Sequence, residues 1–527
     1  MNNFFLRTTV YFVAVFFCAG LVTEGARAGT AVPGDPVTKE KPVPPVNIGS
    51  RLELFVDGYL IDRLTGGGKI VLHHPQPREI VMIHDQPWEG SGSGYHSIFK
   101  DGDKYKMYYK AWQHEASSDL TTAHPLYCAY AESEDGIHWT KPDLGLYEFK
   151  GSRNNNIVFV SGKMGKFNLN AGHPAVFKDD NPDAPADAKY KALLIDQGLI
   201  AFKSADGIHW NLMSDDYIIK DGAFDSQNLA FWDADKKEYR AYWRFFSKGT
   251  PDKPYIGKRL IRTAVSKDFI HWTEQANIQY EDSPEEELYT NQIKPYYRAP
   301  HILLGFPARY IERGWSPSMK ALPELEEREK RAAKSLRYGT ALTESLLMAS
   351  RDGVNFKRWN EAFLRPGIER NGTWTYGDQY IGWHLVETKA ADPGAPNELS
   401  LYATEHYWKD RASYLRRYTL RLDGFVSVNA PLSGGELVTR PIIFKGNSLS
   451  LNFSTSAAGG IQVEVIDAAT NRPVKGFTLD DCYPVFGDTI SRKVEWKKGS
   501  DLSPLQGKAV KLRFVLKDAD LYAFQFQ

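Results

Sequence analysis

The stretch Ser133-Glu134-Asp135-Gly136-Ile137-His138-Trp139 decides the fold of this 527-residue chain, because it recurs along the sequence. Further copies begin at Ser204, Ser266 and Ser350, and a degenerate fifth copy follows as Leu422-Asp423-Gly424-Phe425. Asp-Gly is a strong hairpin-turn signal, since Gly accepts positive φ and Asp bonds to nearby backbone N–H groups. The aspartates lie 71, 62, 84 and 71 residues apart. Such a period is typical of a repeat architecture.

The segments upstream of these turns predict strands. Lys104–Tyr109 and Glu238–Trp243 alternate polar and aromatic residues, and Gly, Asp and Pro bound such runs. Each unit therefore holds about four short antiparallel strands, which is a propeller blade. Five turns predict a five-bladed β-propeller, and the tryptophans of the turns, such as Trp139, are expected to be buried between blades.

The rest of the mature chain is also expected to be all-β. We assign 49–430 to the propeller, and 52–57 and 69–72 are candidates for completing its last sheet. The stretch 323–335 is the one good helix candidate; it is inserted in the fourth unit, and its charged residues are expected to face solvent. Alternating strands separated by turns predict a C-terminal β-sandwich over 431–527.

The N-terminus predicts export. Arg7 supplies a positive charge, an apolar run covers 10–22, and Ala26-Arg27-Ala28 is a small-x-small cleavage site. We therefore predict a signal peptide at 1–28, a disordered leader at 29–48 and a secreted or periplasmic protein. We predict no membrane association after cleavage.

Composition excludes several functions. Lys plus Arg number 65 and Asp plus Glu 65, so there is no basic footprint for nucleic acid. Cleavage would leave two distant cysteines, Cys128 and Cys482, which make neither a disulfide framework nor a zinc site. The histidines are scattered, and we predict no metal and no cofactor. Oligomeric state is not predicted.

The loops that lead into the innermost strands of a propeller converge on one face, and here they combine carboxylates, amides, imidazoles and aromatics. This mixture suits sugar, because hydroxyl groups need donors and acceptors while ring faces stack on aromatics. Glycoside hydrolysis uses paired carboxylates about 5 Å or about 6.5–9.5 Å apart. The catalytic candidates are Glu89, Asp225 and Glu405. The substrate-binding candidates are Asp85, His96, His173, Gln227, Asn291, Trp374, Tyr376, Asp378 and His384.

Structural roles compete with these assignments. Asp85 follows a probable strand end and is equally consistent with a turn cap. Glu287 is a further carboxylate close to the fourth inner strand. Trp374 and Tyr376 are expected to share one face of an extended segment and to stack on a sugar beside Asp378 and His384.

The turns, notably Ser266-Lys-Asp-Phe-Ile-His-Trp272, resemble those of five-bladed propeller glycoside hydrolases, a superfamily that includes families 32 and 43. An exported propeller followed by a β-sandwich is similar to family 32, and Leu54–Ile61 and Tyr289–Gln292 look like an uncharacterised family 32-like branch. The resemblance implies a carboxylate-based glycosidase. The family 32 motifs Trp-x-Asn-Asp-Pro-Asn, Arg-Asp-Pro and Glu-Cys are missing from the sequence, so sucrose and fructan are not implied as substrates.

Two functions from different classes follow. The first is a secreted glycoside hydrolase that cleaves a plant or algal poly- or oligosaccharide by a paired-carboxylate mechanism. The alternative is a non-catalytic propeller that binds glycan or protein. Two carboxylates facing each other across a pocket would favour the enzyme, and a channel plugged by apolar side chains would favour the binder.

Overall fold

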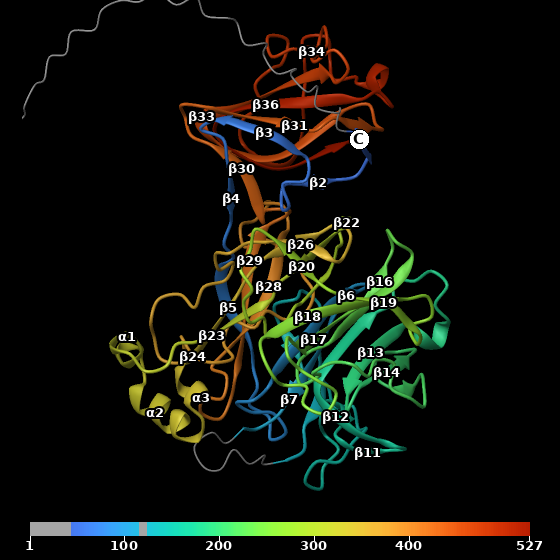
Figure 1. The fold of residues 1–527 in the computed structure, drawn as a ribbon, viewed down its shortest axis with the longest axis vertical. Coiled ribbons are helices and arrows are strands. Elements are labelled where there is room, and N and C mark those ends of the chain that lie inside the picture. The colour runs from blue at the N-terminus through green and yellow to red at the C-terminus, as the bar shows by residue number, and fades with distance from the viewer. Residues whose placement is uncertain (1–43, 115–123) are drawn as a thin grey trace, which may run out of the picture. The chain divides into compact units, whose positions relative to one another are not determined.

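A computed structural model describes residues 44–114 and 124–527. Strands dominate, and five sheets form the expected five-bladed propeller (Figure 1). The predicted signal peptide and residues 29–43 of the predicted leader lie outside the described residues. The last residues of that leader are ordered, because Val46–Gly49 forms strand β1. No helix in the described part of the chain has the length and apolar content that a membrane span requires.

The blades follow one another along the chain, with strands listed here in chain order. Blade 1 contains β6 (Gly94–Asp101), β7 (Lys104–Ala111), β8 (Tyr127–Ser133), β9 (Trp139–Thr140) and β10 (Ile157–Val160). Blade 2 contains β11 (Gly162–Met164), β12 (Phe167–Lys178), β13 (Tyr190–Ile195), β14 (Leu199–Ser204) and β15 (Asn211–Leu212). Blade 3 contains β16 (Leu229–Asp233), β17 (Glu238–Phe246), β18 (Arg259–Ser266) and β19 (Trp272–Asn277).

Blade 4 is the most elaborate. It contains β20 (Gln279–Glu281), β21 (Lys294–Tyr296), β22 (Ala299–Gly305), β25 (Met348–Ser350) and β26 (Asn355–Arg358). Its insertion carries the hairpin β23 (Ala308–Glu312) and β24 (Ala341–Ser345) with helices α1 (Pro317–Ala321), α2 (Leu325–Lys334) and α3 (Leu336–Thr340). Blade 5 contains β27 (Val386–Thr388), β28 (Glu398–Glu405), β29 (Tyr414–Arg421) and, from upstream of blade 1, β5 (Gln76–Ile83).

Side chains of the repeated motif make its turn. Ser133 Oγ accepts a hydrogen bond from Gly136 N at 2.9 Å, and Asp135 Oδ1 accepts from two backbone N–H groups at 2.8 Å. The same bonds recur around Asp206, Asp268 and Asp352. Burial opposes ionisation of Asp135, but bonds from His138 and the backbone hold its pKa well below its usual range. The motif is therefore a turn-forming device at each copy.

The turns also join neighbouring blades. The Tyr402 hydroxyl of blade 5 donates to Gly136 O of blade 1 at 2.6 Å. Equivalent bonds run from Tyr108 to Gly207 O at 2.9 Å and from Tyr242 to Gly353 O at 2.8 Å. The turn tryptophans are half-buried at these contacts, as the edge-to-face pair of Trp139 and Tyr402 shows. The predicted burial of these tryptophans between blades is partial.

The third copy replaces this polar contact with an apolar one. Phe269 stands at the glycine position with φ +70°, and Leu193 stands in blade 2 at the register position of Tyr108 and Tyr242. Phe269 and Leu193 belong to one buried cluster. A left-handed non-glycine residue costs about 1–2 kcal/mol, and burial of the Phe269 ring offsets this cost.

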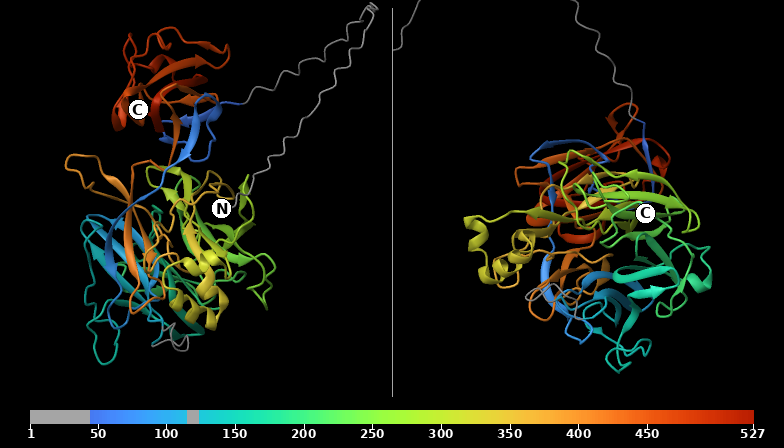
Figure 2. Two further views of the ribbon diagram at one scale, coloured as in Figure 1. Left: turned by 90° about the vertical axis from the view of Figure 1, so that its left-hand side faces the viewer. Right: turned by 60° about the horizontal axis from the view of Figure 1, so that its bottom comes forward.

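The strand that completes the last sheet is β5, which pairs with β29 (Figures 1 and 2). The sequence candidates 52–57 and 69–72 were wrong in this respect. β2 (Glu53–Leu54) pairs with β36, and β4 (Lys69–Leu72) pairs with β30. Alternation marks a strand but not its partner, so these segments looked equally suitable for the ring.

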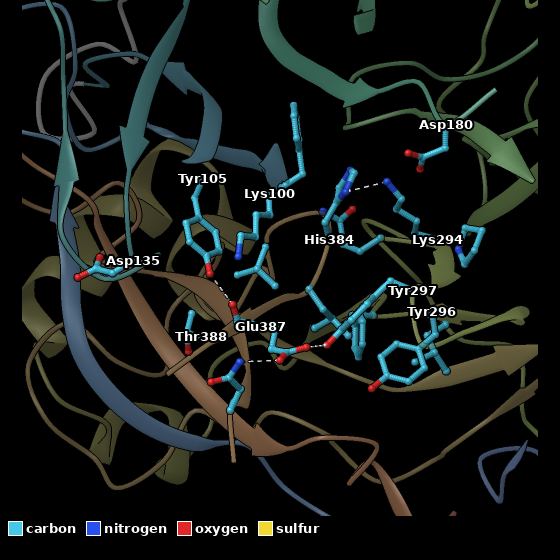
Figure 3. A pocket seen from close by; sticks show the side chains of 18 of the residues that line it. Lys100, Tyr105, Asp135, Asp180, Lys294, Tyr296, Tyr297, His384, Glu387 and Thr388 are labelled. Atoms are coloured by element: carbon cyan, nitrogen blue, oxygen red, sulfur yellow. Dashed lines mark hydrogen bonds between the residues drawn. The ribbon is translucent and has the colours of Figure 1, made fainter. Parts of the chain in front are cut away.

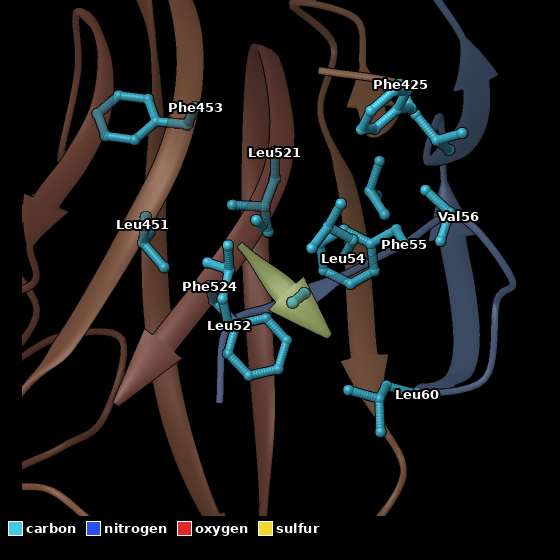
Figure 4. Close-up of a cluster of buried hydrophobic side chains, with 14 of the residues drawn as sticks. Leu52, Leu54, Phe55, Val56, Leu60, Phe425, Leu451, Phe453, Leu521 and Phe524 are labelled. Atoms are coloured by element: carbon cyan, nitrogen blue, oxygen red, sulfur yellow. The ribbon is translucent and has the colours of Figure 1, made fainter. Parts of the chain in front are cut away.

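The C-terminal domain is one 11-stranded sheet that includes four N-terminal strands. The predicted boundaries at 49 and 430 therefore do not separate the propeller from the C-terminal sheet. Its strands are β1–β4, with β3 at Ile61–Gly66, and β30 (Val426–Ala430), β31 (Gly435–Thr439), β32 (Ile442–Phe444), β33 (Leu449–Asp467), β34 (Arg472–Pro473), β35 (Asp488–Lys493) and β36 (Val510–Phe526). Figure 4 shows N-terminal side chains such as Leu54 and Phe55 packed with Phe524 and Leu521.

Helix α2 confirms the helix predicted at 323–335, but its charged residues are not all solvated. Arg328 and Arg331 are buried. The Arg328 guanidinium donates to Thr373 O, and that of Arg331 donates to Trp408 O at 2.6 Å. The arginines therefore attach the insertion to the loops of blade 5.

Candidate functional site

The loops leading into the inner strands bring together a group of buried tyrosines, which we call the tyrosine cluster. It is formed by Tyr95, Tyr289, Tyr310, Tyr376, Tyr380 and Tyr407. Blades 1, 4 and 5 supply these residues. The Tyr376 hydroxyl donates to that of Tyr289 at 3.0 Å, and the Tyr95 ring lies 4.8 Å from His173 of blade 2. The convergence of leading loops predicted from the sequence is present here.

Asp225 of blade 3 adds a carboxylate beside this cluster. Its Oδ1 lies 3.3 Å from His173 Nε2, its Oδ2 lies 3.9 Å from Arg244 Nη2, and its side chain is 60% exposed. Burial lowers the pKa of His173 to about 3, so the imidazole is neutral at pH 7 and its contact with Asp225 is not an ion pair. Asp225 and His173, both predicted from the sequence, therefore form one unit.

Lys110 lies under the cluster and was missed by the sequence analysis. Its Nζ donates to the Tyr407 hydroxyl at 2.9 Å and lies 4.9 Å from the centre of the Tyr95 ring. Burial lowers its pKa to about 7, although the Asp225 charge opposes the shift. A buried amine that titrates near neutral pH can donate or accept a proton. The only sequence signal was its place on the same strand face as Tyr108.

Asp378 supplies a second carboxyl group, which is buried, whereas that of Asp225 is exposed. Asp378 Oδ1 accepts from Tyr407 N at 3.0 Å, and Asp378 Oδ2 lacks a partner among the described residues. Burial raises its pKa to about 8, and the Glu405 charge adds to this shift. Asp378 is therefore protonated at pH 7, which is the state that a general acid requires.

The other two catalytic candidates are held in buried polar networks. Glu89 accepts from the Tyr109 hydroxyl and lies 2.7 Å from Lys141 Nζ. Glu405 accepts from Arg370 at 3.0 Å and from Arg416 at 2.8 Å. Although burial opposes it, these bonds and the Arg416 charge lower the pKa of Glu405. Among the described residues, no hydrogen bond or ion pair joins Glu89 or Glu405 to Asp225.

Four further sequence candidates, Asp85, His96, Asn291 and Trp374, differ in their burial and hydrogen bonds. Asp85 is exposed, and its Oδ1 lies 3.7 Å from Lys141 Nζ. His96 is buried against His84, with 3.0 Å between their Nε2 atoms, and Asn291 is also buried. The ring nitrogen of Trp374 donates to Gly367 O at 2.9 Å.

The expectation that Trp374 and Tyr376 share a face assumed an extended segment, and this assumption was wrong. Trp374 has φ +59°, so the segment turns at this residue and is not extended. Tyr376 lies in the tyrosine cluster, whereas no ring contact joins Trp374 to it in the part of the chain described. His384 was also expected beside Asp378. It instead lines a pocket together with Lys294, and Asp378 does not line that pocket (Figure 3).

Gln227 and Gln292 close the channel through the ring. Gln227 Nε2 donates to Pro174 O at 2.8 Å and to Tyr95 O at 3.1 Å, and Gln292 Nε2 donates to Gln227 Oε1 at 2.8 Å. These bonds link blades 1, 2, 3 and 4 through side chains at the centre. The channel is thus plugged by amides, and Gln227 has a structural role that its assignment to substrate binding did not include.

The pocket in Figure 3, which we call the turn-side pocket, has a volume of about 760 Å³. It is lined by ends of inner strands and by the first turn, including Phe99, Asp135, Lys294, His384 and Glu387. The described residues contain no group of three or more His, Cys, Asp or Glu that could hold a metal ion.

No family model and no curated protein matches the chain. Among solved structures, a family 43 arabinoxylan arabinofuranohydrolase from Bacillus subtilis is 13% identical, with 84% of this chain and 97% of that chain covered and a TM-score of 0.38. The catalytic domain of a family 62 α-L-arabinofuranosidase from Coprinopsis cinerea is 8% identical, covering 66% and 99%, at 0.39. An N-acetylgalactosamine deacetylase from F. plautii is 10% identical, covering 68% and 97%, at 0.40.

Proposed function

We propose that the chain is a glycoside hydrolase that cleaves a plant or algal poly- or oligosaccharide at the tyrosine cluster, with Asp225 as its exposed carboxylate. The observation that supports this proposal is the exposure of Asp225, since Glu89 and Glu405 are both buried in ion pairs. Tyrosine rings with polar tips beside Asp225 offer both the stacking and the hydrogen bonds that sugars need.

We assign the role of general acid to Asp378. A glycosidase needs one carboxyl group that is protonated at its working pH and one that is ionised. Asp378, with its pKa raised to about 8 by burial, meets the first requirement, and we assign the second role to Asp225 because it is exposed.

Asp225→Asn should lower turnover at least about a hundredfold, the low end for general acid–base catalysis. The melting temperature should change little, because the side chain is exposed. The measurement is reducing-sugar release by purified protein across a polysaccharide panel. Asp221→Asn is the matched control, since Asp221 lies in the same loop, is 64% exposed and pairs with Arg262. Full activity of Asp225→Asn would remove Asp225 from the mechanism.

A non-catalytic glycan-binding propeller is the second candidate. It is favoured by the burial of Glu89, Glu405 and Asp378, which leaves Asp225 as the one exposed carboxylate among the four residues. Calorimetric binding of a polysaccharide by the wild-type protein, without any release of reducing ends, would select this function over hydrolysis.

We also propose export, on the sequence of residues 1–28 alone. Expression of the full chain in a bacterial host with mass spectrometry of the periplasmic and secreted fractions tests this. A mature N-terminus at Gly29 is expected, and retention of the intact chain in the cytoplasm would contradict it.

A further inference from the structure

The turn-side pocket is separate from the tyrosine cluster. The hydrogen-bonded pair of Gln227 and Gln292 lies between them, and Gln292 contributes to the floor of the pocket. At about 760 Å³, the pocket lies within the range of about 300–1,000 Å³ typical of small-molecule sites. A ligand here would not contact Asp225 or His173, because neither residue lines the pocket.

The floor of the pocket has hydrogen-bonding groups of both kinds. Lys294 Nζ donates to His384 Nδ1 at 2.9 Å, which leaves the proton of His384 on Nε2. His384 Nε2 and Gln292 Oε1 are buried, and neither has a partner among the described residues. One is a donor and the other an acceptor, so hydroxyl groups, which both donate and accept, match them.

The lining of the pocket carries charges of both signs in nearly equal number. Three lysines stand against four carboxylates: Lys100, Lys294 and Lys389 against Glu134, Asp135, Asp180 and Glu387. Figure 3 shows Asp180 close to the Lys294 side chain. A lining of mixed sign does not favour a ligand of high charge, and it fits a neutral polar one.

Tyr297 provides an aromatic face. The residue is 48% exposed, and its hydroxyl donates to Glu387 Oε2 at 2.7 Å. The other oxygen of Glu387 accepts from Asn397 Nδ2 at 2.7 Å, and the Tyr296 ring packs edge-on at 5.3 Å. The ring is thus fixed by its hydroxyl end while its surface remains open, as in an aromatic anchor for a flat apolar ligand face.

We propose that the turn-side pocket is a second binding site, for a short neutral oligosaccharide that stacks on Tyr297 and whose hydroxyl groups bond to His384 Nε2 and Gln292 Oε1 beside Lys294. This site is independent of the proposed hydrolase activity. It would hold a saccharide on the side of the ring opposite the tyrosine cluster.

The test is calorimetric titration of the Asp225→Asn protein with five neutral trisaccharides, built from xylose, arabinose, mannose, glucose and galactose. At least one should bind, and Tyr297→Ala should weaken it at least about tenfold, as expected for loss of an anchoring ring. Tyr255→Ala is the matched control, because Tyr255 is also an exposed tyrosine (54%) but does not line this pocket. The affinity of the Tyr255→Ala protein for the trisaccharide should be unchanged.

Reductive methylation at pH 8 with peptide mass spectrometry locates the ligand. The trisaccharide should shield Lys294, whose pKa burial lowers to about 8, and leave the labelling of Lys110 unchanged. Failure of all five sugars to bind overturns the proposal. So does binding that Tyr255→Ala abolishes and Tyr297→Ala does not, or tighter binding of trigalacturonate than of any neutral sugar. Loss of turnover in Asp225→Asn is a separate readout, so the two proposals fail independently.

Discussion

At the scale of single residues, exposure separates carboxylates that sequence alone treats as equivalent. Glu89 and Asp225 both follow aromatic residues in leading loops, and nothing local distinguishes them. Three-dimensional packing then places Glu89 against Tyr109 and Lys141, which come from other strands and loops. Candidate residue types could therefore be predicted, but not which of them remains open to a ligand.

Glu89→Gln should destabilise the fold, because it leaves the Lys141 ammonium without its closest carboxylate. Removing one member of a buried ion pair costs about 3–5 kcal/mol of folding stability. Because Lys141 is partly exposed, we expect the free energy of unfolding to fall by about 3 kcal/mol or less. Urea unfolding measures it, with Asp85→Asn as the comparison, since the exposed Asp85 lies farther from Lys141. Unchanged stability with abolished turnover would restore Glu89 as a catalytic candidate.

Asp378 should make stability depend on pH. Its pKa is raised in the folded state, so between about pH 4 and 8 the folded protein binds more protons than the unfolded chain. The contribution of this group to stability therefore falls as pH rises through that window, and levels off above it. Asp378→Asn should show a smaller loss than wild type between pH 5 and pH 8 by urea unfolding. Parallel curves for the two proteins would argue against a raised pKa.

At the scale of elements, the repeated turn was predictable and its partners were not. Asp-Gly and the following Trp appear in sequence, but the hydroxyl that bonds the turn comes from a strand of the preceding blade. The pairing of Phe269 with a leucine in place of a tyrosine becomes visible only through strand register. The location of helix α2 was predicted, while the burial of its arginines depended on loops of another blade.

Tyr242→Phe should cost more stability than Tyr108→Phe. Tyr242 is the hydrogen-bond partner found for Gly353 O in the described chain, whereas Gly207 O also accepts from the Trp210 indole at 3.1 Å. Leaving a buried acceptor unpaired costs about 1–3 kcal/mol, so we expect about 2 kcal/mol for Tyr242→Phe and less than about 1 for Tyr108→Phe. Urea unfolding of both variants measures the difference. Equal losses would mean that the second donor has no protective effect.

At the scale of the whole molecule, the chain closes the ring with a strand that precedes the first blade. The number of blades followed from the spacing of the turns, whereas the closing strand could not be chosen among several alternating segments. Because β4 joins the C-terminal sheet and β5 joins blade 5, the few residues between them connect two separately paired segments.

A chain that begins at residue 84 lacks β5, and it also lacks β1–β4 of the C-terminal sheet, so it should not form a stable monomer. It would expose the edge of β29 in blade 5 and the partners of β1–β4 in the C-terminal sheet, and unpaired edges promote aggregation and swapping. Size-exclusion chromatography and circular dichroism check this, with a chain beginning at Pro44 as the control, since β1 starts at Val46 and all described strands are kept. A monomeric, cooperatively folding chain from residue 84 would show that blade 5 is complete without β5.

The amide plug at Gln227 and Gln292 restricts how a long polymer can be handled. A strand of polysaccharide cannot thread through the ring, so whatever reaches the tyrosine cluster must retreat by the way it came. If the chain is the hydrolase proposed above, successive cuts along one polymer would require release and rebinding, which is the behaviour of a distributive enzyme. Product lengths after brief digestion should accordingly be spread over the whole substrate population rather than concentrated in a few fully degraded molecules.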